Sequence, residues 1–242
     1  MDKIKYLLFD LDGTLLHFNM NQFIGQYLNL IKNHFTDIRE PDRVPSLILQ
    51  GTDLMLHNEG KRCNAEIFLE YFSNQVQLPL AVVWQRFLKF YGTDFNILGS
   101  ITRSDPQARG FLLSALGAGY QLVLATQPVF PLVAIQRRLR WAGLEDIPFE
   151  LITHIENMHA CKPSPVYFRE ILENVNAVAE QCLMIGNEAG TDMASGRIGI
   201  KSFFLKEKAG DNPPEEADYS GNFDDLAAMV LSAEGSEERK RK

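Results

Sequence analysis

The 242-residue sequence has few cysteines and no long apolar run. Its three cysteines, Cys63, Cys161 and Cys182, are scattered without a CxxC pair, which argues against a disulfide framework or a zinc site and suits a reducing compartment. No apolar run approaches the roughly 20 residues of a transmembrane helix, and the first residues lack the pattern of a signal peptide. We therefore expect a soluble cytoplasmic protein with no membrane partner.

Basic residues are also in the minority. Lys and Arg number 24 against 31 Asp and Glu, which gives a formal charge of -7. A chain with this balance is poorly suited to neutralise nucleic-acid phosphates, so we expect no nucleic-acid partner. A basic cluster at residues 239–242 ends a polar segment that predicts a disordered tail over residues 233–242. A polybasic membrane anchor is the less favoured interpretation, because no lipidation signal accompanies the cluster.

Five short apolar runs each end in a polar residue. They cover residues 6–9, 122–125, 149–152, 183–186 and 202–205. Continuous apolar character predicts strands that are buried on both faces of a parallel sheet. Helical patterns over residues 106–116, 131–142 and 165–175 lie between these runs. The alternation predicts a doubly wound α/β sheet, in which the polar strand ends line one crevice.

Residues 18–97 interrupt this alternation. They contain four amphipathic helical patterns, over residues 21–34, 45–58, 64–75 and 80–91, and their aromatic residues recur at helical spacing. Such aromatic stripes are typical of a helical core. We therefore predict an all-helical second domain over residues 18–97, inserted into an α/β core domain of residues 1–17 and 98–232.

The first strand ends in Asp10-Leu11-Asp12-Gly13-Thr14. Asp-Gly between apolar residues is typical of a hairpin turn, but the following residues lead into the helical insertion rather than into a second long strand. An EF-hand is excluded, because the later ligands of its loop are missing. Two carboxylates one residue apart can instead share a divalent cation, which relieves their repulsion.

Three further segments place chemically useful side chains at strand or helix ends. Thr126 and Gln127 follow the second strand, Lys162 precedes a helix that begins after Ser164, and the fourth run enters the acidic loop Gly186-Asn187-Glu188-Ala189-Gly190-Thr191-Asp192. Taken singly, each segment is more often a cap, a turn or a solvated lysine. Their occurrence together and in this order favours a common site.

In these four segments, FDLDGT, LATQ, the lysine of CKPSP and GNEAGTD, the chain resembles the haloacid dehalogenase-like (HAD) hydrolase superfamily. The resemblance extends to about residue 229, because the helical insertion lies where that family carries a helical C1-type cap. It implies a Rossmann-like α/β core and a phosphatase. Asp10 would form an aspartyl-phosphate, and Asp12 would protonate the leaving oxygen and later activate water.

The same resemblance implies the groups that bind phosphate and metal. Thr126, Gln127 and Lys162 would contact the phosphoryl oxygens. The ligands of Mg²⁺ would come from Asp10, Asp12 through its backbone carbonyl, Asn187, Glu188 and Asp192, with Glu188 or Asp192 favoured over Asn187 for direct ligation. The family usually has Asp where this chain has Asn187, which raises the alternative of weak metal binding.

The resulting hypothesis is a Mg²⁺-dependent phosphohydrolase that acts on a small phosphorylated metabolite. Asp12 favours phosphoryl chemistry, because dehalogenases and phosphonatases of this superfamily lack an acid at that position. A phosphomutase of the same fold is one alternative, and a binding or regulatory protein with low activity is another. The sequence specifies neither the substrate nor the oligomeric state.

Overall fold

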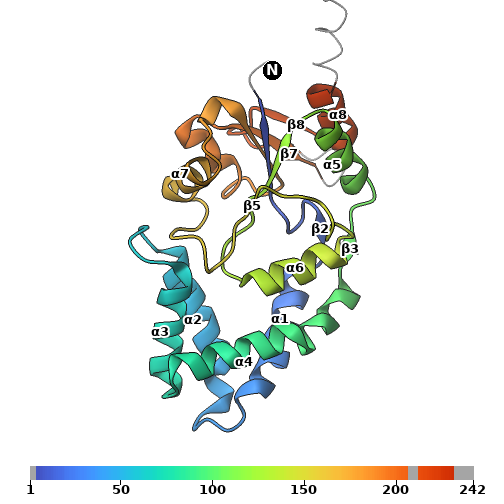
Figure 1. Cartoon of the computed structure of the whole chain (residues 1–242). Coiled ribbons are helices and arrows are strands. Elements are labelled where there is room, and N and C mark those ends of the chain that lie inside the picture. Colours follow the sequence, from blue (N-terminus) through green and yellow to red (C-terminus); the bar gives the residue numbers. More distant parts are fainter. Residues whose placement is uncertain (1–3, 207–211, 232–242) are drawn as a thin grey trace, which may run out of the picture.

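The structure is a computed structural model that describes residues 4–206 and 212–231. Its centre is a six-stranded parallel sheet (Figure 1). In spatial order the strands are β5 (Leu151–Ile152), β4 (Gln121–Leu124), β1 (Tyr6–Phe9), β6 (Cys182–Gly186), β7 (Lys201–Leu205) and β8 (Tyr219–Gly221). The five predicted strands all form. The sixth, β8, was not predicted, because its sequence Tyr-Ser-Gly contains no apolar run.

Both faces of the sheet are covered, as the continuous apolar runs predict. Leu7 and Phe9 of β1 pack on one face with side chains of helices α5, α6 and α8, while Leu8 packs on the other face with side chains of α7. These helices are α5 (Ala108–Gly117), α6 (Leu132–Trp141), α7 (Pro165–Asn174) and α8 (Phe223–Leu231). The predicted α/β fold class with a doubly wound parallel sheet is confirmed.

The starts of two of these helices follow from their capping residues. The Asp105 carboxylate accepts hydrogen bonds from the N–H groups of Gln107 and Ala108 at 2.8 and 3.1 Å, which satisfies donors that the first turn of α5 leaves free. Ser164 likewise accepts from the Val166 N–H at 3.2 Å at the start of α7. The start of α7 after Ser164 agrees with the sequence prediction.

A short antiparallel pair marks the point where the chain leaves the core and returns to it. Strand β2 (Leu16–His17) pairs with β3 (Arg103–Ser104), with Leu16 opposite Ser104. Residues 11–16 form a tight turn before this pair, in which the Gly13 N–H donates to the Leu16 carbonyl at 2.8 Å. The Asp-Gly sequence therefore does form a turn. The strand that follows this turn, β2, pairs with β3 at the other end of the insertion rather than with β1.

The insertion is helical, as predicted. Its main helices are α1 (Met20–Lys32), α2 (Val44–Leu56), α3 (Asn64–Val76) and α4 (Leu80–Gly92), and we call this segment the cap. Short 3₁₀ helices occupy Asn33–Phe35, Pro41–Arg43 and Asp94–Ile101 near the cap, and Ala179–Gln181 and Met193–Ile198 in the core. None of the described helices combines the length and the apolar character needed to cross a bilayer.

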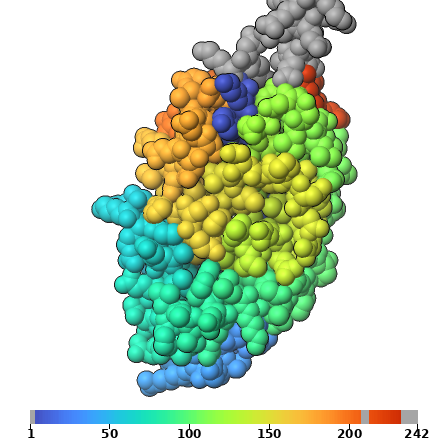
Figure 2. Space-filling model, viewed as in Figure 1, coloured from blue at the N-terminus to red at the C-terminus, as the bar shows by residue number. Residues whose placement is uncertain are grey.

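The cap meets the core at α6, which lies between the cap helices and the sheet (Figure 1). Ala134 of α6 belongs to the apolar cluster of the cap, whereas Ile135 and Leu139 belong to the cluster that covers the sheet. The Trp141 ring lies 5.0 Å from that of Phe95. In Figure 2 the surface of the cap runs directly into the yellow surface of the neighbouring core segments. Helix α6 therefore contributes side chains to both apolar clusters, the one in the cap and the one that covers the sheet.

A buried asparagine adds a polar contact between cap and core. Asn64, at the start of α3, is 0% exposed. Its side-chain amide donates to the carbonyls of Pro128 and Ala160 at 3.2 and 3.3 Å, and its backbone N–H donates to Met158. An unpaired buried amide would be costly, so these bonds specify one docking position for the cap.

The predicted domain boundaries and the predicted tail have different outcomes. The junctions at residues 17/18 and 97/98 stay a prediction, because the apolar cluster of the cap continues into core residues such as Ala134 and Cys161. The tail over residues 233–242 lies outside the described residues.

We predict that Gly99→Ala destabilises the protein while Gly92→Ala does not. A Cβ at position 99 would lie 2.8 Å from Trp141 Nε1, whereas one at position 92 would have no atom within 4 Å. Overpacking at this joint should cost about 1–3 kcal/mol, and the helical Gly92→Ala should be neutral or stabilising by up to about 1 kcal/mol. Urea unfolding of both variants measures the difference. Equal midpoints would contradict the observed packing of the cap against α6.

Candidate active site

The register of the sheet brings three of the predicted motifs to one edge. The Asp10 N–H, directly after β1, donates to the Ile185 carbonyl of β6 at 2.9 Å. On the other side of β1, the Ala125 N–H donates to the Phe9 carbonyl at 2.7 Å. The segments that follow β1, β4 and β6 therefore meet where their strands end, as expected for a parallel α/β sheet.

Lys162 reaches the same edge from the segment before α7. Its Nζ donates to Asp10 Oδ1 and to Asp192 Oδ1, each at 2.6 Å. Lys162, Asp10 and Asp192 are 3%, 7% and 1% exposed. Buried charges require close partners of opposite sign. The ammonium therefore holds together two carboxylates that would otherwise repel each other.

The charges of this group depend on one another. Burial alone would lower the pKa of the Lys162 ammonium, but the negative charges of Asp10 and Asp192 outweigh it and the pKa rises. Burial raises the pKa of the Asp192 carboxyl, Lys162 opposes the rise, and Asp10 adds to it. The lysine therefore stays protonated, and the site retains an excess of negative charge that favours a further cation.

Arg138 on α6 is a residue of the site that the sequence prediction missed. It is 1% exposed, its Nη2 forms an ion pair with Asp12 Oδ2, and its guanidinium carbon lies 5.0 Å from the centre of the Phe130 ring. Burial lowers the pKa of the guanidinium to about 10, and Asp10 opposes this decrease. Arg138 therefore remains charged at neutral pH.

Three atoms of this ion pair lack partners. Among the described residues, Asp12 Oδ1 and the Nε and Nη1 atoms of Arg138 are buried without a hydrogen bond. An unsatisfied buried polar atom costs about 1–3 kcal/mol. A site that retains such atoms has donors and an acceptor available for a bound molecule.

The sequence did contain a signal for Arg138. Ala134, Ile135 and Leu139 form the buried stripe of α6, and Arg138 lies in that stripe at helical spacing. A charged residue at an apolar position predicts either a buried partner or a functional role.

Close approach of two loops requires glycine at position 13. Gly13 has a φ of +82°, and a Cβ there would lie 2.3 Å from Asn187 Nδ2. Next to it, the Thr14 hydroxyl donates to Asn187 Oδ1 at 3.1 Å. The Asn187 side chain is thus held against the Asp12–Gly13 turn, with its amide oxygen on the side of Thr14.

The acidic loop after β6 separates its two acids. Asp192 Oδ2 accepts from the Glu188 N–H at 3.0 Å, which turns the Asp192 carboxylate back toward Lys162. The exposed Glu188 carboxylate accepts instead from the Thr191 hydroxyl at 2.8 Å. The structure therefore brings Asp192 to Asp10 and leaves the Glu188 side chain at the surface.

The oxygen atoms at this edge of the sheet suit Mg²⁺, and they come from neutral groups as well as from carboxylates. No cluster of three or more His, Cys, Asp or Glu side chains that could hold a metal occurs in the described part of the chain. Asp10 and Asp192 supply two buried carboxylates, and the Asp12 carbonyl and the Asn187 amide belong to the adjoining loops. Mg²⁺ needs only one or two carboxylates and keeps several waters. Which of the predicted ligands bind it stays a prediction.

Contacts of Thr126 and Gln127 fix the segments around the candidate site. The Thr126 carbonyl accepts from Thr153 Oγ1 and Tyr167 Oη, each at 2.8 Å. Gln127 Nε2 donates to the Lys162 carbonyl at 3.0 Å, and Gln127 Oε1 accepts from the Lys162 N–H at 2.9 Å. Phosphate binding by these residues stays a prediction. In the structure, the side-chain amide of Gln127 binds the backbone of Lys162 instead.

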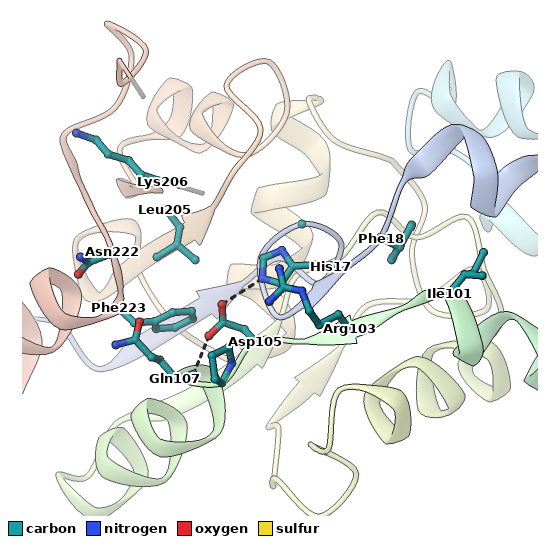
Figure 3. A pocket seen from close by; sticks show the side chains of 12 residues that line it. His17, Phe18, Ile101, Arg103, Asp105, Gln107, Leu205, Lys206, Asn222 and Phe223 are labelled. Atoms are coloured by element: carbon teal, nitrogen blue, oxygen red, sulfur yellow. Dashed lines mark hydrogen bonds and ion pairs between the residues drawn. The ribbon is translucent and has the colours of Figure 1, made fainter. Parts of the chain in front are cut away.

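A cavity of about 640 Å³ adjoins the loop at Gly13, between the β2–β3 pair and the end of β7 (Figure 3). Its wall includes His17 and Asp105, whose Nε2 and Oδ2 atoms are hydrogen-bonded at 3.1 Å, and Phe223 adds an apolar surface. The cavity makes the Gly13 side of the loop accessible to a small molecule.

Comparison with known families identifies the arrangement. A family model described as haloacid dehalogenase-like hydrolase matches residues 4–198, a range that contains every motif of the site. The chain belongs to this family. It is therefore a hydrolase of the HAD type, and the sheet-edge group of Asp10, Lys162 and Asp192 is its candidate catalytic centre.

Individual relatives agree with this assignment. A phosphoglycolate phosphatase from Colwellia psychrerythraea is 33% identical over 94 residues, which are 39% of this chain and 40% of the relative. An HAD phosphatase from Thermococcus onnurineus has a TM-score of 0.60 at 19% identity, with 94% and 98% of the two chains covered. The HAD hydrolase YfnB from Bacillus subtilis, solved with magnesium, has a TM-score of 0.56 at 22% identity, with 94% and 99% covered. The structural similarities show the fold.

We predict that Gln127→Ala destabilises the HAD core, because it removes the partners of both backbone groups of Lys162. The loss should be about 1–3 kcal/mol, measured by urea unfolding. Gln136→Ala, at an exposed position of α6, is the matched control and should change the stability by less than about 0.5 kcal/mol. Equal stability of the two variants would show that the two hydrogen bonds between Gln127 and the Lys162 backbone are unimportant for stability.

Proposed function

We propose that this HAD hydrolase is a Mg²⁺-dependent phosphatase of a small phosphorylated metabolite, and that it works through a phosphorylated Asp10. The observation that carries the proposal is the buried Lys162 ammonium, 2.6 Å from both Asp10 and Asp192, with Asp12 two residues after Asp10. This group presents a nucleophilic carboxylate beside a fixed positive charge. The carboxylate of Asp12 supports a phosphatase rather than a dehalogenase.

The first step transfers the phosphoryl group to Asp10. An Asp10 carboxylate oxygen forms a bond to phosphorus while the bond between phosphorus and the ester oxygen breaks. The electron pair of the broken bond stays on the leaving oxygen, which takes a proton from Asp12. Lys162 and the Thr126 segment meet the charge on the phosphoryl oxygens.

The second step releases phosphate. Asp12 takes a proton from water, the water oxygen bonds to phosphorus, and the bond between phosphorus and Asp10 breaks to restore the carboxylate. Mg²⁺ held by Asp10, Asp192 and neutral oxygens of Asp12 and Asn187 would supply charge neutralisation for the phosphoryl group. The buried position of Lys162 and Asp192 excludes bulk water from their side of the site.

One relative indicates the first substrate to test. The wall of the 640 Å³ cavity includes Gly13 but none of Asp10, Lys162 and Asp192, so its volume does not define the substrate. The phosphoglycolate phosphatase relative makes phosphoglycolate the first ester to test. A sugar monophosphate should be tested next, because formation of an isomer without free phosphate would indicate a phosphomutase instead.

We predict that Asp10→Asn abolishes Mg²⁺-dependent release of phosphate from p-nitrophenyl phosphate. Loss of the nucleophile should lower kcat by at least about 1000-fold, and removal of Mg²⁺ by EDTA should have a similar effect on the unaltered protein. Asp53→Asn, at an exposed cap position, is the control and should retain full activity. An Asp10→Asn variant that remains active would refute the phosphorylated-enzyme mechanism.

We also predict that Asn187→Asp lowers the Mg²⁺ concentration needed for half-maximal activity by about tenfold. The new carboxylate places one more negative charge beside the metal site, while its oxygen still accepts from the Thr14 hydroxyl. Titration with Mg²⁺ at constant ionic strength measures the shift. An unchanged or higher requirement would place the metal away from position 187.

A further inference from the structure

The ion pair between Asp12 and Arg138 involves only one carboxylate oxygen of Asp12 and one guanidinium nitrogen of Arg138. Arg138 Nη2 contacts Asp12 Oδ2, whereas Asp12 Oδ1 has no hydrogen-bond partner among the described residues. The carboxylate is thus held at one oxygen, while the other is buried and unpaired. In the proposed reaction, this unpaired oxygen is the one that exchanges a proton with the leaving group and with water.

The guanidinium is itself held in place. Arg138 is 1% exposed within α6, and the face of the Phe130 ring lies 5.0 Å from its guanidinium carbon. Phe130 in turn packs against Tyr27 and Tyr91 of the cap, with ring centres 5.6 and 6.4 Å apart. A side chain buried in this way has few rotamers available, so it can fix the orientation of its partner.

We propose that Arg138 is a positioning residue for Asp12, an inference that rests on the proposed phosphatase function. It holds Asp12 Oδ2 so that Oδ1 faces the reacting centre and takes the proton from the attacking water. A carboxylate that rotates freely would spend little time in that orientation, and a proton-transfer group that is out of position loses most of its effect. The guanidinium thus acts through Asp12.

The experiment separates the two steps of the reaction. p-Nitrophenolate is a good leaving group, so transfer of the phosphoryl group to Asp10 depends little on Asp12, whereas attack by water depends on it fully. In Arg138→Met we expect kcat to fall about 100-fold while kcat/KM falls less than about tenfold. A burst of one nitrophenolate per protein should precede the slow steady state. Mass spectrometry of acid-quenched protein should show one added phosphoryl group on Asp10.

Two comparisons test whether the effect passes through Asp12. Asp12→Asn should show the same burst, and adding Arg138→Met to it should lower kcat by less than about threefold further, because residues that act as one unit are not additive. Arg140→Met, two residues away on α6 and 59% exposed, should behave as the unaltered protein. Arg138→Lys keeps the charge and most of the volume, and it serves if Arg138→Met does not fold. It should show the same burst with a smaller loss of kcat.

The contrary outcomes can be told apart. Equal losses of kcat and kcat/KM without accumulation of the phosphorylated protein would overturn the positioning role and leave the phosphatase proposal intact. Additive losses in the double variant would do the same. If the unaltered protein shows no turnover that depends on Asp10, the phosphatase proposal fails and the role of Arg138 fails with it.

Discussion

The contact of one ammonium with two carboxylates, all buried, is the constraint on which the site depends. Lys162 lies 2.6 Å from both Asp10 and Asp192, and each of these groups would be costly to bury alone. The sheet register, the Gln127 clamp on the Lys162 backbone and the Glu188 N–H on Asp192 all serve this contact. The same arrangement keeps the Asp10 carboxylate buried next to a fixed cation.

Much of this centre could be predicted from the sequence, because its residues follow apolar strands. In a parallel sheet the strand ends meet, so Asp10, Thr126 and Asn187 were expected to lie together before their positions were known. Lys162 could be placed only by its resemblance to a family motif, since its position depends on the path of the chain before α7. The cap helices were predictable from their aromatic spacing, and β8 was not, because it has no apolar pattern.

The unpredicted features are contacts between distant parts of the chain. Gln127 is a neutral side chain whose meaning depends on the Lys162 backbone 35 residues later. Glu188 and Asp192 have the same charge, and only the loop conformation shows that one turns inward and the other outward. Arg138 differs from these, because a charged residue within an apolar helical stripe was visible in the sequence and its partner was not.

The position of α6 limits how the cap of this protein can be exchanged for another. A cap that formed a separate module could be replaced without effect on the core below it. Here Ala134 and Trp141 pack with the cap, while Arg138 on the same helix contacts Asp12. A transplanted cap would have to reproduce the surface that α6 meets, so new specificity should arise by changes around that joint rather than by exchange of the whole insertion.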